Sequence, residues 1–296
     1  MIFVIVGPTG IGKSSLSEVY ALKHDAFIIN GDAFQCYKEM NIGTAKPHRE
    51  NRNEKTNFLF DIRSVEEGYT IFDYQKDLRS TLDSLLKEGK DIIIVGGSGL
   101  YLKSALYDFE LSTSQQSYDM GKFDNLSDEQ LHKHLEGIDF EESQKIHFKN
   151  RKRVLRAIQI YYESGETKTA LLSKQEHKLL YPVTFVGLEL ENRENLYELI
   201  NERVDIMLKE GLLEEVKSLF EKYGDSLRAF QAIGYKEIMQ YFKGELSLEE
   251  AISKVKKNTR NYAKRQMTFF KNQFENINWF NNKEDAIKYV EGLKRD

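Results

Sequence analysis

The 296-residue chain contains little cysteine and proline and has no long apolar run. Its one cysteine, Cys36, cannot form an internal disulfide, so we expect a protein of the reducing cytoplasm. The three prolines and the lack of low-complexity tracts argue against long disordered linkers. No apolar run approaches the roughly 20 residues of a membrane span. We therefore expect no membrane partner, and we expect a monomer.

The sequence also lacks the residue spacing of a metal site built from histidine and cysteine. Only six histidines are present, and His132 and His134 are two residues apart on a predicted helix. Residues at this spacing do not share a helix face, so we interpret both as solvated side chains.

Acidic residues are absent from two segments, although the net charge of the chain is −4. Residues 143–162 contain six cations, and residues 251–274 contain seven. One such run alone is typical of a solvated helix face. Two strongly basic helices in a mildly acidic protein favour a polyanionic partner.

A glycine-rich motif near the start of the chain predicts a phosphate site. It fits the phosphate-loop pattern and consists of Gly7, Pro8, Thr9, Gly10, Ile11, Gly12, Lys13 and Ser14. An apolar strand is predicted before it at 2–6 and a helix after it, so backbone N–H groups and a helix dipole surround one anion. Lys13 neutralises a phosphate oxygen in this prediction, and the Ser14 hydroxyl is a ligand for Mg²⁺. The motif predicts binding of a di- or triphosphate.

Enzymes with such a phosphate site usually have an apolar strand that ends in an acidic residue, but the best candidate for that strand here does not end in one. The apolar run 91–95 ends in Gly96-Gly97-Ser98-Gly99, whereas the run 26–30 is followed by Gly31 and Asp32. The carboxyl edge of a parallel sheet is where ligands bind, so Asp32 is a candidate base. The alternative is that Asp32 caps a helix starting near Ala33.

The order of predicted elements indicates an α/β fold, with a P-loop parallel sheet core wrapped by helices. Strands are predicted at 2–6, 26–30, 57–62, 91–95 and 183–190, and helices at 13–23, 72–88, 128–136, 143–164, 168–178, 196–210, 212–223, 235–242 and 248–274. Residues 1–107 and 183–296 form the expected core domain with C-terminal helices. Residues 108–182 form a helical insertion, placed where P-loop kinases carry their lid. In the predicted helix 143–164, Lys149, Arg153 and Arg156 share one stripe.

Several segments, in order along nearly the whole chain, resemble the tRNA dimethylallyltransferases, also called tRNA isopentenyltransferases. Besides the phosphate loop they are Asp32-Ala33-Phe34-Gln35-Cys36-Tyr37, Asn41-Ile42-Gly43-Thr44-Ala45-Lys46-Pro47, Gly96-Gly97-Ser98-Gly99-Leu100-Tyr101, Asn150-Arg151-Lys152-Arg153-Val154-Leu155-Arg156-Ala157, Gln231-Ala232-Ile233-Gly234-Tyr235-Lys236-Glu237 and Thr259-Arg260-Asn261-Tyr262-Ala263-Lys264-Arg265-Gln266.

The resemblance implies transfer of a dimethylallyl group from dimethylallyl diphosphate to N6 of the adenosine just 3′ of the tRNA anticodon. It implies that Asp32 is the general base, that Ser98 stabilises the oxygen between allyl group and diphosphate, and that Gln35 contacts the flipped adenine. The residues it places on the tRNA anticodon stem-loop are Asp32, Ala33, Phe34, Gln35, Ser98, Lys152, Arg153, Val154, Leu155 and Arg156. Phe34, Tyr37 and Tyr101 are further candidates for stacking on a base.

Four departures and three alternatives accompany the resemblance. In the phosphate loop, Gly10-Ile11 stands where the family commonly has Ala-Ser, and Ser14 stands in place of threonine. Ser98 stands where the family commonly has threonine, which keeps the hydroxyl, and Gln231 stands where some members have arginine. An adenylate isopentenyltransferase acting on free nucleotide would share the loop and Asp32 but would not need two basic helices. A P-loop kinase would lack its usual acid-ended strand. A non-catalytic RNA-binding module is the third alternative.

Overall fold

The computed structural model describes residues 1–48, 50, 52–53, 55–109 and 118–293. The chain divides into two compact units. The core unit consists of Met1–Leu106 and Tyr181–Asp296, and the insertion unit is Tyr107–Leu180.

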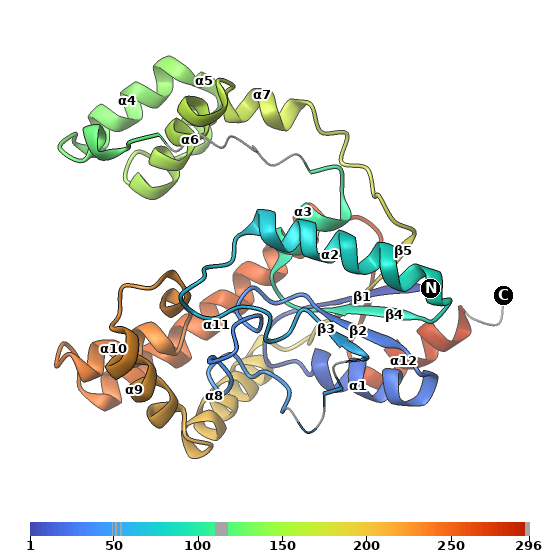
Figure 1. Cartoon of the computed structure of the whole chain (residues 1–296). Coiled ribbons are helices and arrows are strands. Elements are labelled where there is room, and N and C mark those ends of the chain that lie inside the picture. Colours follow the sequence, from blue (N-terminus) through green and yellow to red (C-terminus); the bar gives the residue numbers. More distant parts are fainter. Residues whose placement is uncertain (49, 51, 54, 110–117, 294–296) are drawn as a thin grey trace. The chain divides into compact units, whose positions relative to one another are not determined.

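A parallel six-stranded sheet forms the centre of the core unit (Figure 1). The strands are β1 (Ile2–Val6), β2 (Phe27–Asn30), β3 (Asn57–Phe58), β4 (Ile92–Val95), β5 (Val183–Leu188) and β6 (Ile277–Phe280), in the spatial order β3-β2-β4-β1-β5-β6. β1, β2 and β4 are buried along their whole length, as expected for apolar strands covered on both faces. The predicted α/β fold class is confirmed.

Helices cover this sheet and extend beyond it. They are α1 (Lys13–His24), α2 (Ile71–Leu85), α3 (Gly99–Leu106), α8 (Arg193–Lys209), α9 (Leu212–Tyr223), α10 (Tyr235–Phe242), α11 (Leu248–Gln273) and α12 (Lys283–Gly292), with 3₁₀ turns η2 (Leu86–Glu88) and η4 (Arg228–Gln231). α1 and α12 pack together, and α2 packs on α3. The long helix α11 contacts α3, α8 and α10, and therefore joins the sheet to the C-terminal helices.

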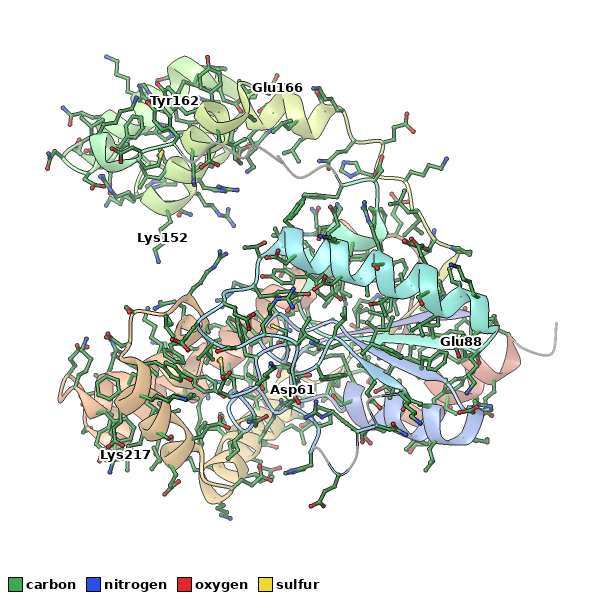
Figure 2. All side chains as sticks on the ribbon, viewed as in Figure 1. Asp61, Glu88, Lys152, Tyr162, Glu166 and Lys217 are labelled. Carbon is green, nitrogen blue, oxygen red and sulfur yellow. The ribbon has the colours of Figure 1, made fainter. Side chains whose placement is uncertain are left out.

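The strand predicted at 57–62 is reduced to Asn57–Phe58. Leu59 and Asp61 have left-handed backbone conformations, with φ of 63° and 53°, which end the pairing. Asp61 is labelled in Figure 2. Its carboxylate lies 2.6 Å from the Nζ of the buried Lys46. A partly buried ion pair therefore stands in place of the second half of the predicted strand.

The insertion unit is helical, and it packs around a core of its own. Its elements are η3 (Gly121–Phe123), α4 (Asp128–Ile138), α5 (Phe140–Lys145), α6 (Arg151–Ser164) and α7 (Lys168–Ser173). The predicted helix 143–164 is in fact two helices, because α5 ends at Lys145 and α6 begins only at Arg151. Lys149 lies in the connection, so it does not continue the stripe of Arg153 and Arg156, and that prediction was wrong.

The histidine interpretation was also wrong. His132 and His134 are half-buried in the insertion unit rather than solvated. His132 Nε2 lies 3.0 Å from the Ser143 carbonyl oxygen and 2.9 Å from that of Ile146, and His134 Nε2 lies 3.1 Å from the Tyr162 hydroxyl. Both side chains therefore hold the helices of this unit together.

Candidate active site

The phosphate loop connects β1 to α1, as its sequence predicted. Gly12 precedes α1 with φ of 91°, a left-handed conformation that favours glycine. Ser14 is the second residue of α1, so its hydroxyl belongs to the positively polarised helix start. The structure therefore has the strand, turn and helix that an anion site of this kind needs.

Lys13 is half-buried within this loop. Its Nζ donates a 2.8 Å hydrogen bond to the carbonyl oxygen of Pro8. Burial, reinforced by the positive charge of Arg203, lowers the pKa of Lys13 to about 7, and the carboxylate of Asp32 opposes that shift. The charges of Lys13, Arg203 and Asp32 therefore influence one another at the carboxyl edge of the sheet.

Asp32 is presented by a tight turn at the end of β2. The buried Asn30 side chain accepts from the Asp32 N–H at 2.9 Å and donates to the Asp32 carbonyl oxygen at 3.0 Å. Asp32 Oδ1 accepts from the Phe34 N–H at 2.9 Å. No helix begins near Ala33, so the helix-cap alternative is wrong and Asp32 closes a turn instead.

Asp32 is half-buried, and the desolvation of its carboxyl group raises its pKa. Hydrogen bonds from the Phe34 and Gln35 amides, together with the charges of Lys13 and Arg203, act in the opposite direction. A carboxylate with a raised pKa is a better proton acceptor than an exposed one, which suits general-base chemistry.

The turn after β4 brings Ser98 beside Asp32. Ser98 Oγ accepts a 2.9 Å hydrogen bond from the N–H of Ala33, the residue after Asp32. β2 and β4 are neighbours in the sheet, so the two turns leave the same edge. The structure therefore brings Asp32, Ala33 and Ser98 together.

The neighbouring residues proposed to contact a base have different surroundings. Phe34 lines a pocket and is half-exposed. The Gln35 amide donates to the Thr44 carbonyl oxygen at 3.0 Å and thereby holds the loop after β2. Tyr37 is only 2% exposed, so its ring is not available for stacking. Tyr101 is half-buried, and its hydroxyl bonds the Tyr69 carbonyl oxygen.

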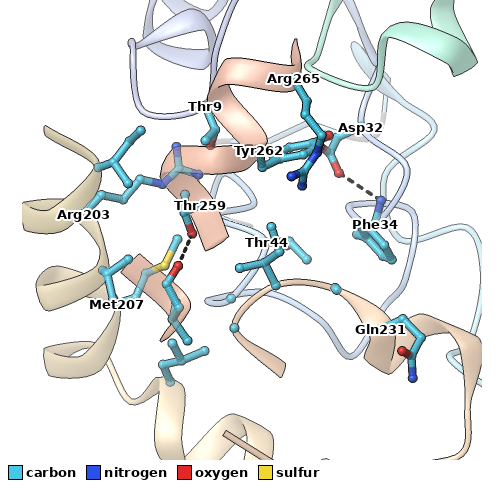
Figure 3. Close-up of a pocket in the computed structure, with 18 residues that line it drawn as sticks. Thr9, Asp32, Phe34, Thr44, Arg203, Met207, Gln231, Thr259, Tyr262 and Arg265 are labelled. Carbon is cyan, nitrogen blue, oxygen red and sulfur yellow. Dashed lines mark hydrogen bonds between the residues drawn. The ribbon is translucent and has the colours of Figure 1, made fainter. Parts of the chain in front are cut away.

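A pocket of about 280 Å³ lies beside Asp32 and the phosphate loop (Figure 3). Its polar lining includes Thr9, Asp32, Arg203, Thr259, Tyr262 and Arg265. Its apolar lining includes Ile200, Val204, Met207, Leu212, Ile233 and Val255. A mostly apolar cavity with a few convergent polar groups is typical of a small-molecule site.

Two helices supply much of this lining. On α11, the polar Tyr262 and Thr259 are followed toward the start of the helix by the apolar Val255, at helical spacing. On α8, Arg203 lies between the apolar Ile200 and Met207, about one turn from each. Arg203 is therefore a cation within an apolar part of the lining.

Sequence reasoning did not place Arg203, Thr259, Tyr262 or Arg265 in the site. Arg203 comes from α8, whose buried stripe contains Ile200 and Val204. A cation directly beside a buried stripe is the signal that could have identified it. The other three belong to the matched segment 259–266, but no contact with the substrate pocket was predicted for any of them.

The residues expected on tRNA in the insertion unit differ in exposure. Lys152, labelled in Figure 2, is exposed, and so are Arg153 and Arg156. Val154 is fully buried in the core of this unit, so its side chain has no surface to offer to RNA, and Leu155 is half-buried. The neighbouring Arg151 donates hydrogen bonds to the carbonyl oxygens of Leu126, Phe123 and Asp124, so it stabilises the unit itself.

The described part of the chain contains no cluster of three or more histidine, cysteine, aspartate or glutamate residues able to hold a metal ion. None of its helices is both long and apolar enough to span a membrane.

Comparisons with known proteins show the family of this chain. The family model described as IPP transferase matches residues 35–273. A tRNA dimethylallyltransferase from Bacillus anthracis is 40% identical over 98% of this chain and 95% of its own length.

Two solved structures are similar over almost the whole chain. A tRNA delta(2)-isopentenylpyrophosphate transferase from Staphylococcus epidermidis is 36% identical with a TM-score of 0.73, covering 99% of this chain and 98% of its own. A eukaryotic dimethylallyltransferase described as acting on tRNA is 26% identical with a TM-score of 0.85, covering 99% of this chain and 79% of its own. The chain therefore belongs to the IPP transferase family.

Proposed function

We propose that this protein transfers the dimethylallyl group of dimethylallyl diphosphate to N6 of the adenosine 3′-adjacent to the anticodon in tRNA, releasing diphosphate. One observation supports this above all. The half-buried carboxyl group of Asp32, whose pKa is raised by desolvation, lines the same pocket as Thr9 of the phosphate loop, and the rest of that pocket is largely apolar. A base, an anion cradle and an apolar slot are what the reaction requires.

The leaving diphosphate is held by the phosphate loop in this proposal. The backbone amides of residues 7–14 and the start of α1 face the anion, and Lys13 and Arg203 supply positive charge. Charge stabilisation is the main task, because the allyl group separates easily as a stabilised cation.

The residues at the loop also fit Mg²⁺. Mg²⁺ keeps several waters and binds through few protein ligands together with substrate phosphates, and Ser14 offers one hydroxyl at the start of α1. Ser14 would hold the ion, which supplies further neutralisation of the diphosphate charge.

The transfer forms one bond, breaks another and moves one proton. The N6 nitrogen forms a bond to the first carbon of the allyl group while the bond from that carbon to the diphosphate oxygen breaks. The electron pair of the broken bond leaves with diphosphate. Asp32 accepts the proton that N6 loses, and the Ser98 hydroxyl donates a hydrogen bond to the departing oxygen. The adenine must leave its stack to reach Asp32.

Product analysis tests the proposal. The protein is incubated with Mg²⁺, dimethylallyl diphosphate and either unmodified tRNA or AMP, and the nucleosides are analysed by mass. We expect dimethylallyl-adenosine from tRNA and not from AMP. Product from AMP alone would establish the free-nucleotide enzyme instead.

Donor choice is a second test. The apolar side chains of Met207, Leu212 and Val255 leave few polar partners for a ribose or a base. Calorimetric titration in the presence of Mg²⁺ and tRNA should therefore give tighter binding of dimethylallyl diphosphate than of ATP. Tighter binding and hydrolysis of ATP would favour a kinase-like enzyme.

A further inference from the structure

Gln266 joins two separate parts of the proposed site. Its Oε1 accepts a 2.9 Å hydrogen bond from the N–H of Thr9, in the phosphate loop. Its Nε2 donates a 2.9 Å hydrogen bond to the carbonyl oxygen of Gly97, the residue before Ser98. The side chain is only 4% exposed, and both ends of its amide are bonded to backbone.

The glycine at position 97 is explained by this side chain. A Cβ atom built on Gly97 would lie 2.0 Å from Gln266 Nε2, although the backbone of Gly97 does not have a left-handed φ. Space, not backbone conformation, therefore requires glycine here. Gly99 is similar, because its Cβ would lie 2.4 Å from the ring of Phe269, which is also on α11. Helix α11 therefore packs directly against the turn around Ser98.

The same helix touches Ser98 directly. The hydroxyl of Tyr262, one turn before Gln266, interacts with the side chains of both Ser98 and Gln266. The phosphate loop, the Ser98 turn and the pocket wall are thus connected through one face of α11.

From this geometry we infer that Gln266 is a positioning residue for the transfer reaction, fixing the phosphate loop relative to the Ser98 hydroxyl. This inference rests on the proposed function. The diphosphate is held by the loop, whereas the oxygen that departs from the allyl group is met by Ser98. The two hydrogen bonds of Gln266 set the distance between these partners. Because both ends of its amide are bonded to backbone, Gln266 itself does not need to touch the substrate.

A double-mutant cycle at positions 97 and 266 tests the inference. Gln266→Ala removes both hydrogen bonds, and Gly97→Ala forces the glutamine side chain away. Each substitution alone should lower kcat by about 10–100-fold, because small misplacement of reacting groups is costly. The double variant should be no slower than the slower single variant, since the methyl group added at position 97 has room once Gln266 is truncated. The KM for tRNA should stay within about twofold, because neither residue is among the proposed RNA contacts.

Asn258→Ala is the matched control on the same helix. Asn258 donates a 2.7 Å hydrogen bond to Glu237 of α10, away from the phosphate loop. It should lower the melting temperature without lowering kcat. A kcat for Gln266→Ala within twofold of wild type, or rate losses that multiply in the double variant, would overturn the inference.

Binding of inorganic pyrophosphate separates this inference from the proposed function. Gln266→Ala and Gly97→Ala should each weaken pyrophosphate binding by about 2–10-fold, without further loss in the double variant. If the wild-type protein binds pyrophosphate but makes no product from tRNA, the proposed function fails while this pattern still decides the role of Gln266. Unchanged pyrophosphate affinity in both single variants would then reject the proposed positioning role of Gln266.

Discussion

Asp32 depends on Asn30 for its position at the end of β2. Asn30 is 1% exposed, and its carbonyl oxygen accepts from the buried Tyr74 hydroxyl, so the turn is anchored in the core. The Asp32 carboxylate in turn accepts a hydrogen bond from a backbone amide. A fixed and desolvated carboxylate needs little reorganisation when it accepts a proton.

Replacement of Asp32 tests its role as base. Asp32→Ala should lower kcat by about 10²–10⁴-fold with little change in tRNA affinity, because only the proton acceptor is lost. Asp32→Asn is the control for turn geometry, since an amide oxygen can still accept from the Phe34 N–H. It should fold normally and be similarly slow. Single-turnover kinetics and tRNA binding assays measure the two effects, and a loss under threefold would remove Asp32 from the mechanism.

The pKa values of Lys13 and Asp32 predict a bell-shaped pH profile of kcat/KM. On the acid side activity should fall as Asp32 is protonated, with an inflection above the usual aspartate value, because burial raises its pKa. On the alkaline side Lys13 loses its charge as pH rises through about 7, and capture of the diphosphate weakens. The bound diphosphate raises the pKa of Lys13, so the profile of kcat should extend to higher pH.

Lys13→Arg separates the two limbs. Arginine stays charged throughout this range, so the variant should lose the alkaline limb while keeping the acid one. An alkaline limb unchanged in the variant would show that another group causes it.

At the scale of elements, a carboxylate on α9 holds the loop that follows β2. Glu215 accepts hydrogen bonds from the N–H groups of Asn41, Ile42 and Gly43 at 3.0, 2.9 and 3.1 Å. The buried Tyr235 adds a 2.6 Å hydrogen bond from its hydroxyl. Gly43 also lines the pocket, so this contact sets one wall of the site.

Loss of this carboxylate should be costly. Glu215→Ala leaves three amides without their partner, and we expect the free energy of unfolding to fall by about 2–4 kcal/mol. Urea denaturation monitored by circular dichroism measures this. Glu214→Ala is the control, since Glu214 is exposed on the same helix and should change stability by less than about 0.5 kcal/mol. Equal effects of the two substitutions would contradict the proposed role of the Glu215 contacts.

Elements with a clear apolar pattern were predictable from the sequence, including the short strand β1 at 2–6, whereas elements without one were not. The helix predicted at 212–223 agrees with α9, and the one at 248–274 agrees within one residue with α11. β6 and α12 were not predicted, because β6 has only four residues, all half-buried, with no clear alternation. The break between α5 and α6 was missed because residues 146–150 contain neither glycine nor proline.

At the scale of the whole molecule, the sequence identified the site through turns that meet at one sheet edge. The phosphate loop, Asp32 and Ser98 follow strands β1, β2 and β4, so topology alone brings them together. Arg203 and Gln266 arrive from helices distant in sequence. The buried stripe beside Arg203 could have pointed to that residue, but no local pattern tells which loops the side chain of Gln266 bonds.

Tertiary packing also changes the interpretation of the basic segments. In α11, Lys256 pairs with Asp205 at 2.6 Å, and Lys271 pairs with Glu189 at 2.7 Å. Arg260 donates a 2.6 Å hydrogen bond to Asn201. Part of this basic run therefore stabilises the core unit. Lys257 and Lys264 are exposed, as are Lys152 and Arg153 of the insertion unit.

This difference between paired and exposed cations predicts how tRNA binding responds to salt. Each cation that neutralises an RNA phosphate releases counterions, so affinity should fall steeply between about 50 and about 200 mM salt. Arg153→Ala should weaken binding to all substrate tRNAs about equally and reduce the log–log salt slope by about one unit. Lys256→Ala is the matched control, because its charge is already paired with Asp205, and it should leave the slope unchanged. Filter binding at several salt concentrations measures both. An unchanged slope for Arg153→Ala and for Lys264→Ala would mean that the exposed cations of neither unit touch RNA, and would favour a free-nucleotide substrate.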